Sequence, residues 1–171
     1  KIMAIQSRPG FFLLGGGRTG ASLAWYFLQQ NIHISALVET NPERFQYLQA
    51  TFHWNFLQRR ISLKRLNESA LVILAVPDGS IADTCHHLAR LSVSWKEKMV
   101  IHCSGTLPVS ILQALSDQGA YTASFHPIYS FPINPADNRY LKDCWFDIES
   151  DDEGYKRLKA LMPLNLKKFF R

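Results

Sequence analysis

The first residues with a spacing that could do chemistry form a glycine loop. Gly15, Gly17 and Gly20 follow the pattern G-x-G-x-x-G, and Arg18 and Thr19 lie between the second and third glycines. The first glycine permits a tight turn, the second leaves room for a pyrophosphate, and the third lets a helix pack against a strand. A helix that begins here would offer N–H groups and partial positive charge to phosphate. The spacing predicts a dinucleotide site, with a glycine-rich turn that binds nothing as the alternative. A P-loop is excluded, because no Gly-Lys-Ser/Thr follows.

An acidic residue follows the second predicted strand. Glu39 lies 19 residues after Gly20, near the usual position of the acid that binds a ribose 2′-hydroxyl. This favours NAD, because a carboxylate repels a 2′-phosphate. Arg44, one helical turn further on, could instead bind such a phosphate, and Glu39 could simply be a solvated residue at a strand end. NAD and NADP therefore both remain open.

Further polar or turn-forming residues follow three later apolar runs. Val76 and Pro77 end the run 71–76 and are predicted to contact the cofactor, while Ser104 and His126 follow the next two runs. Hydride transfer to or from a C–O or C–N carbon needs a proton partner, and histidine supplies one near neutral pH. Ser104 could orient a substrate oxygen. The alternative for His126 is a cap that bonds a backbone group at the end of its strand.

The elements that must position these residues alternate along the chain. Apolar runs predict strands, and helical periodicity follows most of them. The expected strands are 11–14, 32–38, 71–76, 99–103, 121–125 and 145–148, with a short one near 54–56; helices are expected over 19–30 and from residues 41, 78, 108 and 151. This alternation predicts an α/β fold with a doubly wound, mostly parallel Rossmann-type sheet, whose ligands bind at the carboxyl ends of the strands.

Composition excludes several classes of protein. The 171 residues carry a net charge of +5 and are 47% hydrophobic, which is typical of one globular domain rather than a disordered chain. No apolar run is long enough to span a membrane. Three cysteines without a C-x-x-C pair argue against a disulfide framework and a structural zinc site, so a reducing compartment, the cytoplasm, is expected. No metal site is predicted, because Asp83 and His87 lack a third ligand.

Several other groups are expected to be structural. The basic pair Arg59-Arg60 is interpreted first as a solvated face, with a polyanion site as the alternative, and His102 as a buried histidine whose hydrogen bonds are satisfied. Asp78 is expected to cap a helix, and Cys103 to fill core space. The alternation of aromatic residues over 52–56 indicates a strand rather than a base-stacking platform, so nucleic-acid binding is not supported.

Three short motifs at successive strand ends accompany the glycine loop. They are V-P-D at 76–78, H-x-S-G at 102–105 and S-x-H-P at 124–127. Together they resemble the Rossmann-like proteins with a C-terminal domain of the DUF2520 type, described as predicted NAD(P)-dependent oxidoreductases. That family is related to 6-phosphogluconate-dehydrogenase-like and pyrroline-carboxylate-reductase-like enzymes and, more distantly, to prephenate dehydrogenase. The resemblance runs from about residue 12 to residue 170.

The resemblance implies a two-part enzyme. A Rossmann domain, here residues 1–171, would be followed beyond residue 171 by a helical domain that forms a homodimer and closes the active site. In prephenate-dehydrogenase-like relatives, residues at the positions of Ser104 and His126 contact the substrate. The family usually has a Ser-Arg pair after the second strand, suggestive of NADP, where this chain has Glu39-Thr40-Asn41.

These observations predict the dinucleotide-binding half of an oxidoreductase that acts on a small molecule by hydride transfer. One alternative is a non-catalytic nucleotide-binding or sensor module that works through protein contacts. A methyltransferase, which also uses a glycine-rich loop and an acid after the second strand, is a third possibility. The helix that starts at the glycine loop fits NAD(P) better.

Overall fold

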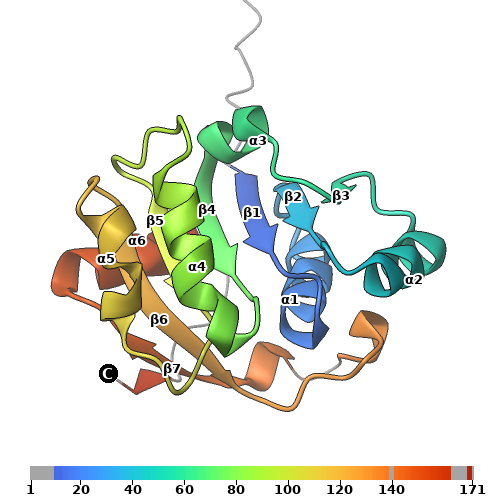
Figure 1. Cartoon of the computed structure of the whole chain (residues 1–171). Helices are drawn as coiled ribbons and strands as arrows, with labels where there is room; N and C mark the ends of the chain where they lie inside the picture. The colour runs from blue at the N-terminus through green and yellow to red at the C-terminus, as the bar shows by residue number, and fades with distance from the viewer. Residues whose placement is uncertain (1–9, 139–140, 163–168, 171) are drawn as a thin grey trace, which may run out of the picture.

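A single eight-stranded sheet organises the chain in the computed structural model, which describes residues 10–138, 141–162 and 169–170 (Figure 1). The strand order is β3-β2-β1-β4-β5-β6-β7-β8. The strands are β1 (Gly10–Leu14), β2 (Ile34–Val38), β3 (Leu57–Gln58), β4 (Ser69–Leu74), β5 (Met99–His102), β6 (Tyr121–Ile128), β7 (Trp145–Glu149) and β8 (Phe169–Phe170). The first six strands have the 3-2-1-4-5-6 order of a doubly wound nucleotide-binding sheet, so the predicted fold class is confirmed.

Helices cover both faces of this sheet. They are α1 (Arg18–Gln29), α2 (Pro42–Phe52), α3 (Leu63–Glu68), α4 (Asp78–Ala89), α5 (Gln113–Ser116) and α6 (Asp152–Leu161), with short 3-10 turns η1 (Val109–Leu112), η2 (Pro135–Asp137) and η3 (Leu141–Asp143). Helices α4 and α5 lie in front of the sheet in Figure 1, and α1 and α6 lie behind it. No helix in the described ranges has the length and apolar character that crossing a membrane requires.

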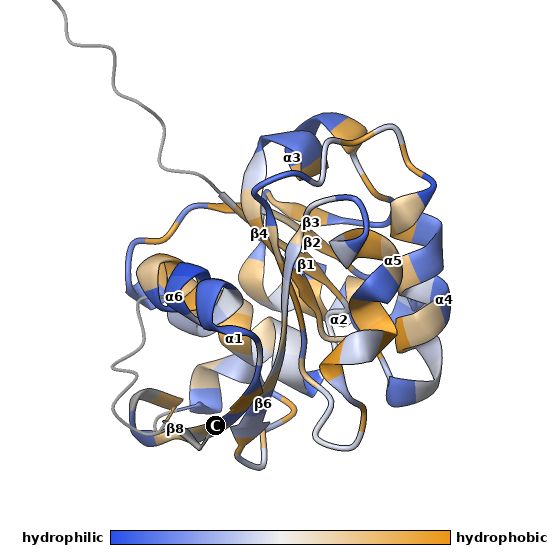
Figure 2. Cartoon of the chain, turned by 90° about the vertical axis from the view of Figure 1, so that its left-hand side faces the viewer, coloured by the Kyte–Doolittle hydropathy of each residue, from blue (hydrophilic) through white to orange (hydrophobic). Residues whose placement is uncertain are grey.

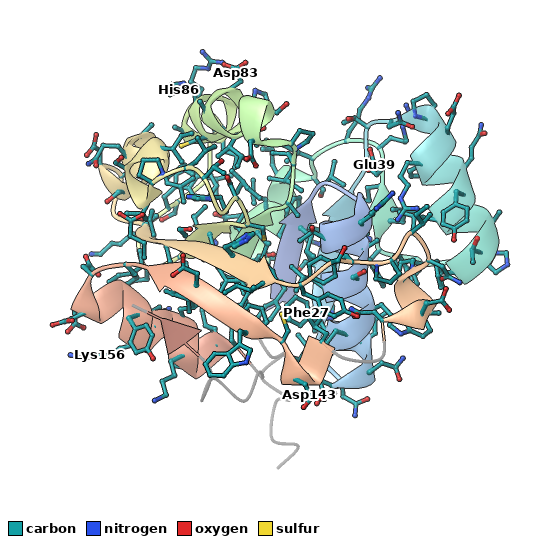
Figure 3. All side chains as sticks on the ribbon, turned by 90° about the horizontal axis from the view of Figure 1, so that it is seen from below. Phe27, Glu39, Asp83, His86, Asp143 and Lys156 are labelled. Atoms are coloured by element: carbon teal, nitrogen blue, oxygen red, sulfur yellow. The ribbon has the colours of Figure 1, made fainter. Side chains whose placement is uncertain are left out.

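The two helical layers bury two apolar cores. Phe27 points from α1 into the first core, where its ring lies 5.1 Å from that of Phe11 on β1 (Figure 3). Phe12, the next residue of β1, points to the second core beneath α3, α4 and α5. Because every residue of β1 is buried, the strand is apolar throughout, as parallel central strands are. Figure 2 shows these orange strands enclosed by helices with blue outer faces.

Strand β6 is longer than the sequence predicts. The expected end at Phe125 is wrong, because the strand continues through His126 and Pro127 to Ile128. Pairing with β5 ends at Ser124, but the antiparallel partner β7 pairs with β6 over the whole segment from Ser124 to Ile128. Beyond Ser124 the strand has one neighbour only, and there a proline is tolerated.

The region between α2 and β4 also differs from the prediction. The short strand expected at 54–56 is found at Leu57–Gln58 instead. Phe52, Trp54 and Phe56 form a stack, with ring centroids 4.7 and 5.2 Å apart. Helix α3 is not predicted at all, because its six residues are too few to show a helical period.

The predicted strand 71–76 begins and ends two residues earlier, at Ser69–Leu74. This shift leaves Ala75 and Val76 at the strand tip, and Val76 lies beside the glycine loop in the cavity described below.

Candidate functional site

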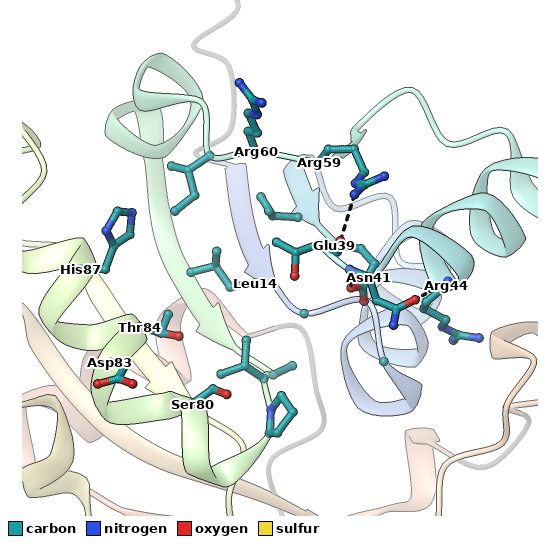
Figure 4. Close-up of a pocket in the computed structure, with 18 of the residues that line it drawn as sticks. Leu14, Glu39, Asn41, Arg44, Arg59, Arg60, Ser80, Asp83, Thr84 and His87 are labelled. Atoms are coloured by element: carbon teal, nitrogen blue, oxygen red, sulfur yellow. Dashed lines mark hydrogen bonds between the residues drawn. The ribbon is translucent and has the colours of Figure 1, made fainter.

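A cavity of about 1210 Å³ lies at the carboxyl ends of β1, β2 and β4, between the glycine loop and one face of α4 (Figure 4). Its walls come from the glycine loop, the β2 tip, the segment after β3, the β4 tip and α4. The lining residues from these segments include Gly15, Gly17, Arg18, Thr19, Glu39, Thr40, Asn41, Arg44, Arg59, Arg60, Val76, Pro77, Ser80, Asp83, Thr84 and His87. This is the edge where doubly wound sheets bind their ligands.

Two glycines of the loop are required by the protein's own packing. Gly15 has a φ of +97°, a conformation that L-residues rarely adopt, and a side chain there would collide with the Ala75 carbonyl. A Cβ at Gly20 would collide with the Gly15 carbonyl oxygen. These two positions therefore make the tight turn and the close packing of α1 that the motif predicts.

Gly17 is different, because the protein itself does not require a glycine there. Its φ of −62° suits any residue. No described atom lies within 4 Å of the position that a Cβ would take, and Gly17 is exposed. Gly17 is also the N-cap of α1, and no described side chain caps the helix. The N–H groups of the first turn therefore face open space that a side chain at residue 17 would fill, which is the arrangement that a bound phosphate needs.

Glu39 braces the glycine loop against the end of β2. Its side chain is buried, with 8% exposed. Oε2 accepts a hydrogen bond from the Gly16 N–H at 2.9 Å, and Oε1 accepts one from the Asn41 N–H at 2.7 Å. The carboxylate thus lines the cavity while each oxygen already has a backbone partner. The solvated strand-end interpretation of Glu39 is wrong.

Arg44 is held in a similar way. Its Nε donates to the Gly16 carbonyl at 2.7 Å, and one terminal nitrogen donates to the Ile133 carbonyl at 3.2 Å. Burial lowers the pKa of Arg44, while the nearby Tyr47 and Glu39 act in the opposite direction. This guanidinium, the phosphate ligand considered from the sequence, instead ties the loop around residue 133 to the glycine loop.

A chain of polar side chains links the tips of β4 and β5. Thr106 Oγ1 donates to Asp78 Oδ2 at 2.8 Å and lies 3.2 Å from Ser104 Oγ. Because the Asp78 carboxylate only accepts, the Ser104 hydroxyl must be the donor to Thr106. The Thr106 N–H in turn donates to Ser104 Oγ at 3.2 Å. The prediction that Asp78 caps α4 is wrong: Pro77 is the N-cap, and Asp78 bonds a threonine from another strand tip.

His126 is fixed beside this chain. Its Nδ1 lies 3.1 Å from the Cys103 carbonyl, which can only accept, so the proton of a neutral ring resides on Nδ1. The ring packs directly over Gly105, where a Cβ would be 2.6 Å from Nε2. Nε2 is left as the atom that could exchange a proton with a substrate.

His102 lies in the layer beneath, facing the core under α4 and α5. The predicted burial is confirmed, but the predicted hydrogen bonds are not: neither ring nitrogen has a partner of ordinary geometry among the described residues. Burial lowers the pKa of His102, although the Pro108 backbone, Glu149 and Asp78 partly oppose this effect. The ring is therefore a neutral, buried part of the core.

Two further sequence predictions concern metal ligands and the Cys103 thiol. No group of three potential metal ligands occurs within the described part of the chain. Burial raises the pKa of the Cys103 thiol to about 12, so the prediction that it serves as packing stands.

The structure divides the predicted site residues into two groups. Every predicted cofactor residue except Gly20, which packs behind the loop, lines the cavity. The His126 ring packs over Gly105, the residue after Ser104, so Ser104 and His126 are close together. Neither residue lines the cavity.

Sequence reasoning missed the two solvent-facing pairs that complete the cavity, Arg59 with Arg60 and Asp83 with His87. Their local sequence is that of solvated surface. The two adjacent arginines were the one sequence feature that indicated this part of the cavity. Their position in the fold is evident only once β3 is paired with β2.

Comparison with known protein families matches residues 11–127 to the Rossmann-like domain. This range contains the glycine loop, the β2 tip and both Ser104 and His126. No curated protein sequence matches the chain.

Solved structures with the same fold are oxidoreductases by description. An imine reductase from Pseudomonas sp. superposes with a TM-score of 0.70 at 20% identity, over 95% of this chain and 55% of that protein. A candidate NADP oxidoreductase from Bacteroides fragilis gives 0.73 at 18% identity, over 95% and 60%. A prephenate dehydrogenase from A. aeolicus, in complex with hydroxyphenyl propionate and NAD+, gives 0.68 at 14% identity, over 91% and 56%. This chain therefore spans little more than half the length of these proteins.

Proposed function

We propose that this chain, which belongs to the Rossmann-like domain family, is the dinucleotide-binding part of an NAD(P)-dependent oxidoreductase that acts on a small molecule. One observation carries the proposal. Gly17 is a glycine that neither the backbone nor the packing requires, and it keeps clear the space above the uncapped start of α1. A ligand with a pyrophosphate explains why that space is kept free.

The residues around the cavity fit such a ligand. The pyrophosphate would bind over Gly17 to the first-turn N–H groups of α1, with Arg18 and Thr19 beside it. The adenosine side would extend toward the β2 tip and the face of α4, and the nicotinamide toward Val76 and Pro77. A nicotinamide dinucleotide supplies hydride transfer when it is bound.

His126 and Ser104 are the groups that we assign to the substrate. His126 Nε2 would exchange a proton with the substrate, because Nδ1 is held by the Cys103 carbonyl. Ser104 would position a polar group of the substrate through the lone pair that the Thr106 N–H does not use. The neighbouring descriptions as imine reductase and prephenate dehydrogenase fit a substrate that is reduced or oxidised at a C–N or C–O carbon.

A second domain would complete this end of the site. Ser104 and His126 do not line the cavity, and the structural neighbours are much longer than this chain. We propose that a helical domain closes the substrate pocket over β5 and β6 and forms a homodimer. Three cysteines without a C-x-x-C pair also fit the reducing, cytoplasmic location that we propose.

The decisive experiment compares nucleotide binding by wild-type protein, Gly17→Val and Gly79→Val. Both glycines lie at helix starts with open space around them, but Gly79 does not line the cavity. We expect NADH or NADPH, followed by their fluorescence, to bind wild type and Gly79→Val alike. Affinity should fall about 100-fold or more in Gly17→Val, because the valine occupies the pyrophosphate space. Unfolding midpoints of the free variants should match. Equal affinity in all three proteins would disprove the proposal.

The distance of Ser104 and His126 from the cavity also favours the sensor alternative, in which the domain binds a nucleotide without catalysis. Full-length protein that binds NAD(P)H tightly, yet turns over no imine, keto acid or hydroxy acid, would support that alternative. Turnover that is lost in His126→Ala with cofactor affinity retained would support the enzyme.

A further inference from the structure

The tip of β2 carries a guanidinium that comes from the neighbouring strand. The Glu39 N–H donates to the Gln58 carbonyl at 2.9 Å, which places Arg59, the next residue, level with the β2 tip. One terminal nitrogen of Arg59 donates to the Thr40 carbonyl at 3.0 Å, and the guanidinium lies 5.4 Å from the centre of the Phe45 ring. Arg59 is therefore oriented over the place where a doubly wound sheet binds the adenosine ribose.

The other charged groups at this tip hold the neighbouring loops together. Both oxygens of Glu39 accept backbone N–H groups, and the Arg44 guanidinium bonds two carbonyls. The Glu39 carboxylate, which would repel a 2′-phosphate, lines the cavity, but each of its oxygens is engaged by a backbone N–H dipole. One of the five N–H donors of the Arg59 guanidinium bonds the Thr40 carbonyl. The other donors have no acceptor among the described residues.

Charge over the whole cavity points the same way. Four arginines line it, Arg18, Arg44, Arg59 and Arg60, against the two carboxylates of Glu39 and Asp83. Figure 4 shows Arg59 directed down to the β2 tip, whereas the adjacent Arg60 points away from it. The two arginines carry the same charge, and their positions distinguish them.

From this geometry we infer that Arg59 binds the 2′-phosphate of the adenosine ribose, so that the site prefers NADP(H) to NAD(H). The inference rests on the proposed dinucleotide function and adds the identity of the cofactor and the residue that selects it. The planar guanidinium suits a phosphate, since two parallel N–H groups can bond two of its oxygens. Its stacking on Phe45 and its bond to Thr40 hold it ready before the ligand arrives.

Dissociation constants for NADPH, NADH, 2′,5′-ADP and 5′-AMP, measured on wild type, Arg59→Gln and Arg60→Gln, test the inference. Wild type should bind NADPH about tenfold or more tighter than NADH, and 2′,5′-ADP tighter than 5′-AMP. Arg59→Gln should abolish both preferences by weakening the phosphorylated ligands alone. Arg60→Gln removes the same charge at a residue that also lines the cavity, so it should weaken all four ligands by a similar factor and leave both preferences in place.

Three outcomes would overturn the inference in different ways. Equal or tighter binding of NADH by wild type would show that the site is not selective for the 2′-phosphate. Equal weakening of all four ligands by Arg59→Gln would make Arg59 a brace for the β2 tip rather than a phosphate ligand. Failure of wild type to bind any of them would defeat the dinucleotide site itself. Matching circular-dichroism spectra and melting curves confirm that the variants fold.

Discussion

The two ends of the sheet's carboxyl edge use their polar groups in opposite ways. At the β1–β2 end, which we call the cavity end, Glu39 and Arg44 brace the loops from below and leave the space over Gly17 clear. At the β5–β6 end, which we call the reaction end, the buried Ser104 and the half-buried His126 bond their own neighbours. The first end encloses a cavity, whereas Ser104 and His126 at the second end are oriented by hydrogen bonds but do not line that cavity.

Under the proposed function, one sheet completes a cofactor site and only orients the groups of a substrate site. Binding a dinucleotide needs backbone N–H groups and free space next to them for the pyrophosphate, and one βαβ unit supplies both. Chemistry on a small molecule needs walls that exclude water, and those come from elements beyond the strand tips. This division predicts that disturbing one end leaves the other intact.

The largest effect is expected from removing the brace of the cavity end. Glu39→Ala leaves the N–H groups of Gly16 and Asn41 without their acceptor. We expect the free energy of unfolding, measured by urea denaturation, to fall by about 2–4 kcal/mol, because two donors at least partly buried lose their bonds. Nucleotide affinity should fall with it, since the glycine loop loses its support.

Glu43→Ala is the matched control, because Glu43 is exposed on the first turn of the adjacent helix α2 and should cost about 0.5 kcal/mol or less. If both variants were equally stable, the cavity end would not depend on its buried carboxylate. The proposed difference between the cavity end and the reaction end would then be lost.

The next prediction concerns the reaction end alone. Gly105→Ala places a methyl group against the His126 ring, whose own bond to the Cys103 carbonyl resists displacement. We expect a loss of about 1–3 kcal/mol in the free energy of unfolding, as for overpacked sites. The ring signals of His126 should shift in the NMR spectrum. Nucleotide affinity should change less than about twofold, because the cavity lies elsewhere.

Gly17→Val gives the opposite pattern, with affinity lost and stability retained. Together, the two variants show that the cavity end and the reaction end can be disturbed separately. A Gly105→Ala protein that lost nucleotide binding as well would show that the two ends are coupled.

Local features of the sequence were sufficient to predict the glycine loop and the βαβ unit of the cavity end. The glycine spacing, the apolar run before it and the acid after the second strand lie within about 30 residues of one another, and they predict the βαβ unit that the structure has. Strand ends were less well predicted where partners matter. The extension of β6 through His126 depends on β7, which lies 17 or more residues further along the chain.

The same physical reason explains what was missed at the site. Arg59 reaches the β2 tip only because β3 pairs with β2 in one register, and Asp78 bonds Thr106 only because two strand tips meet. Nothing in the sequence near Arg59 or Asp78 distinguishes these roles from a solvated pair and a helix cap. Side chains that act across strands require the register, which a single sequence does not reveal.

The smallest expected effect tests whether the buried His102 ring, close to the reaction end, stays neutral as the pH falls. Burial lowers the pKa of His102 below its usual value in the folded chain. As pH falls below about 6.5, the unfolded chain takes up a proton that the folded ring refuses, so the free energy of unfolding decreases. The slope approaches about 1.4 kcal/mol per pH unit until the lowered folded pKa is reached. His102→Leu should lack this contribution, whereas the exposed control His86→Gln should retain it. Urea denaturation at about pH 7, 6 and 5 measures the difference. An identical acid dependence in wild type and His102→Leu would mean that the folded ring takes up the proton as readily as the unfolded chain does.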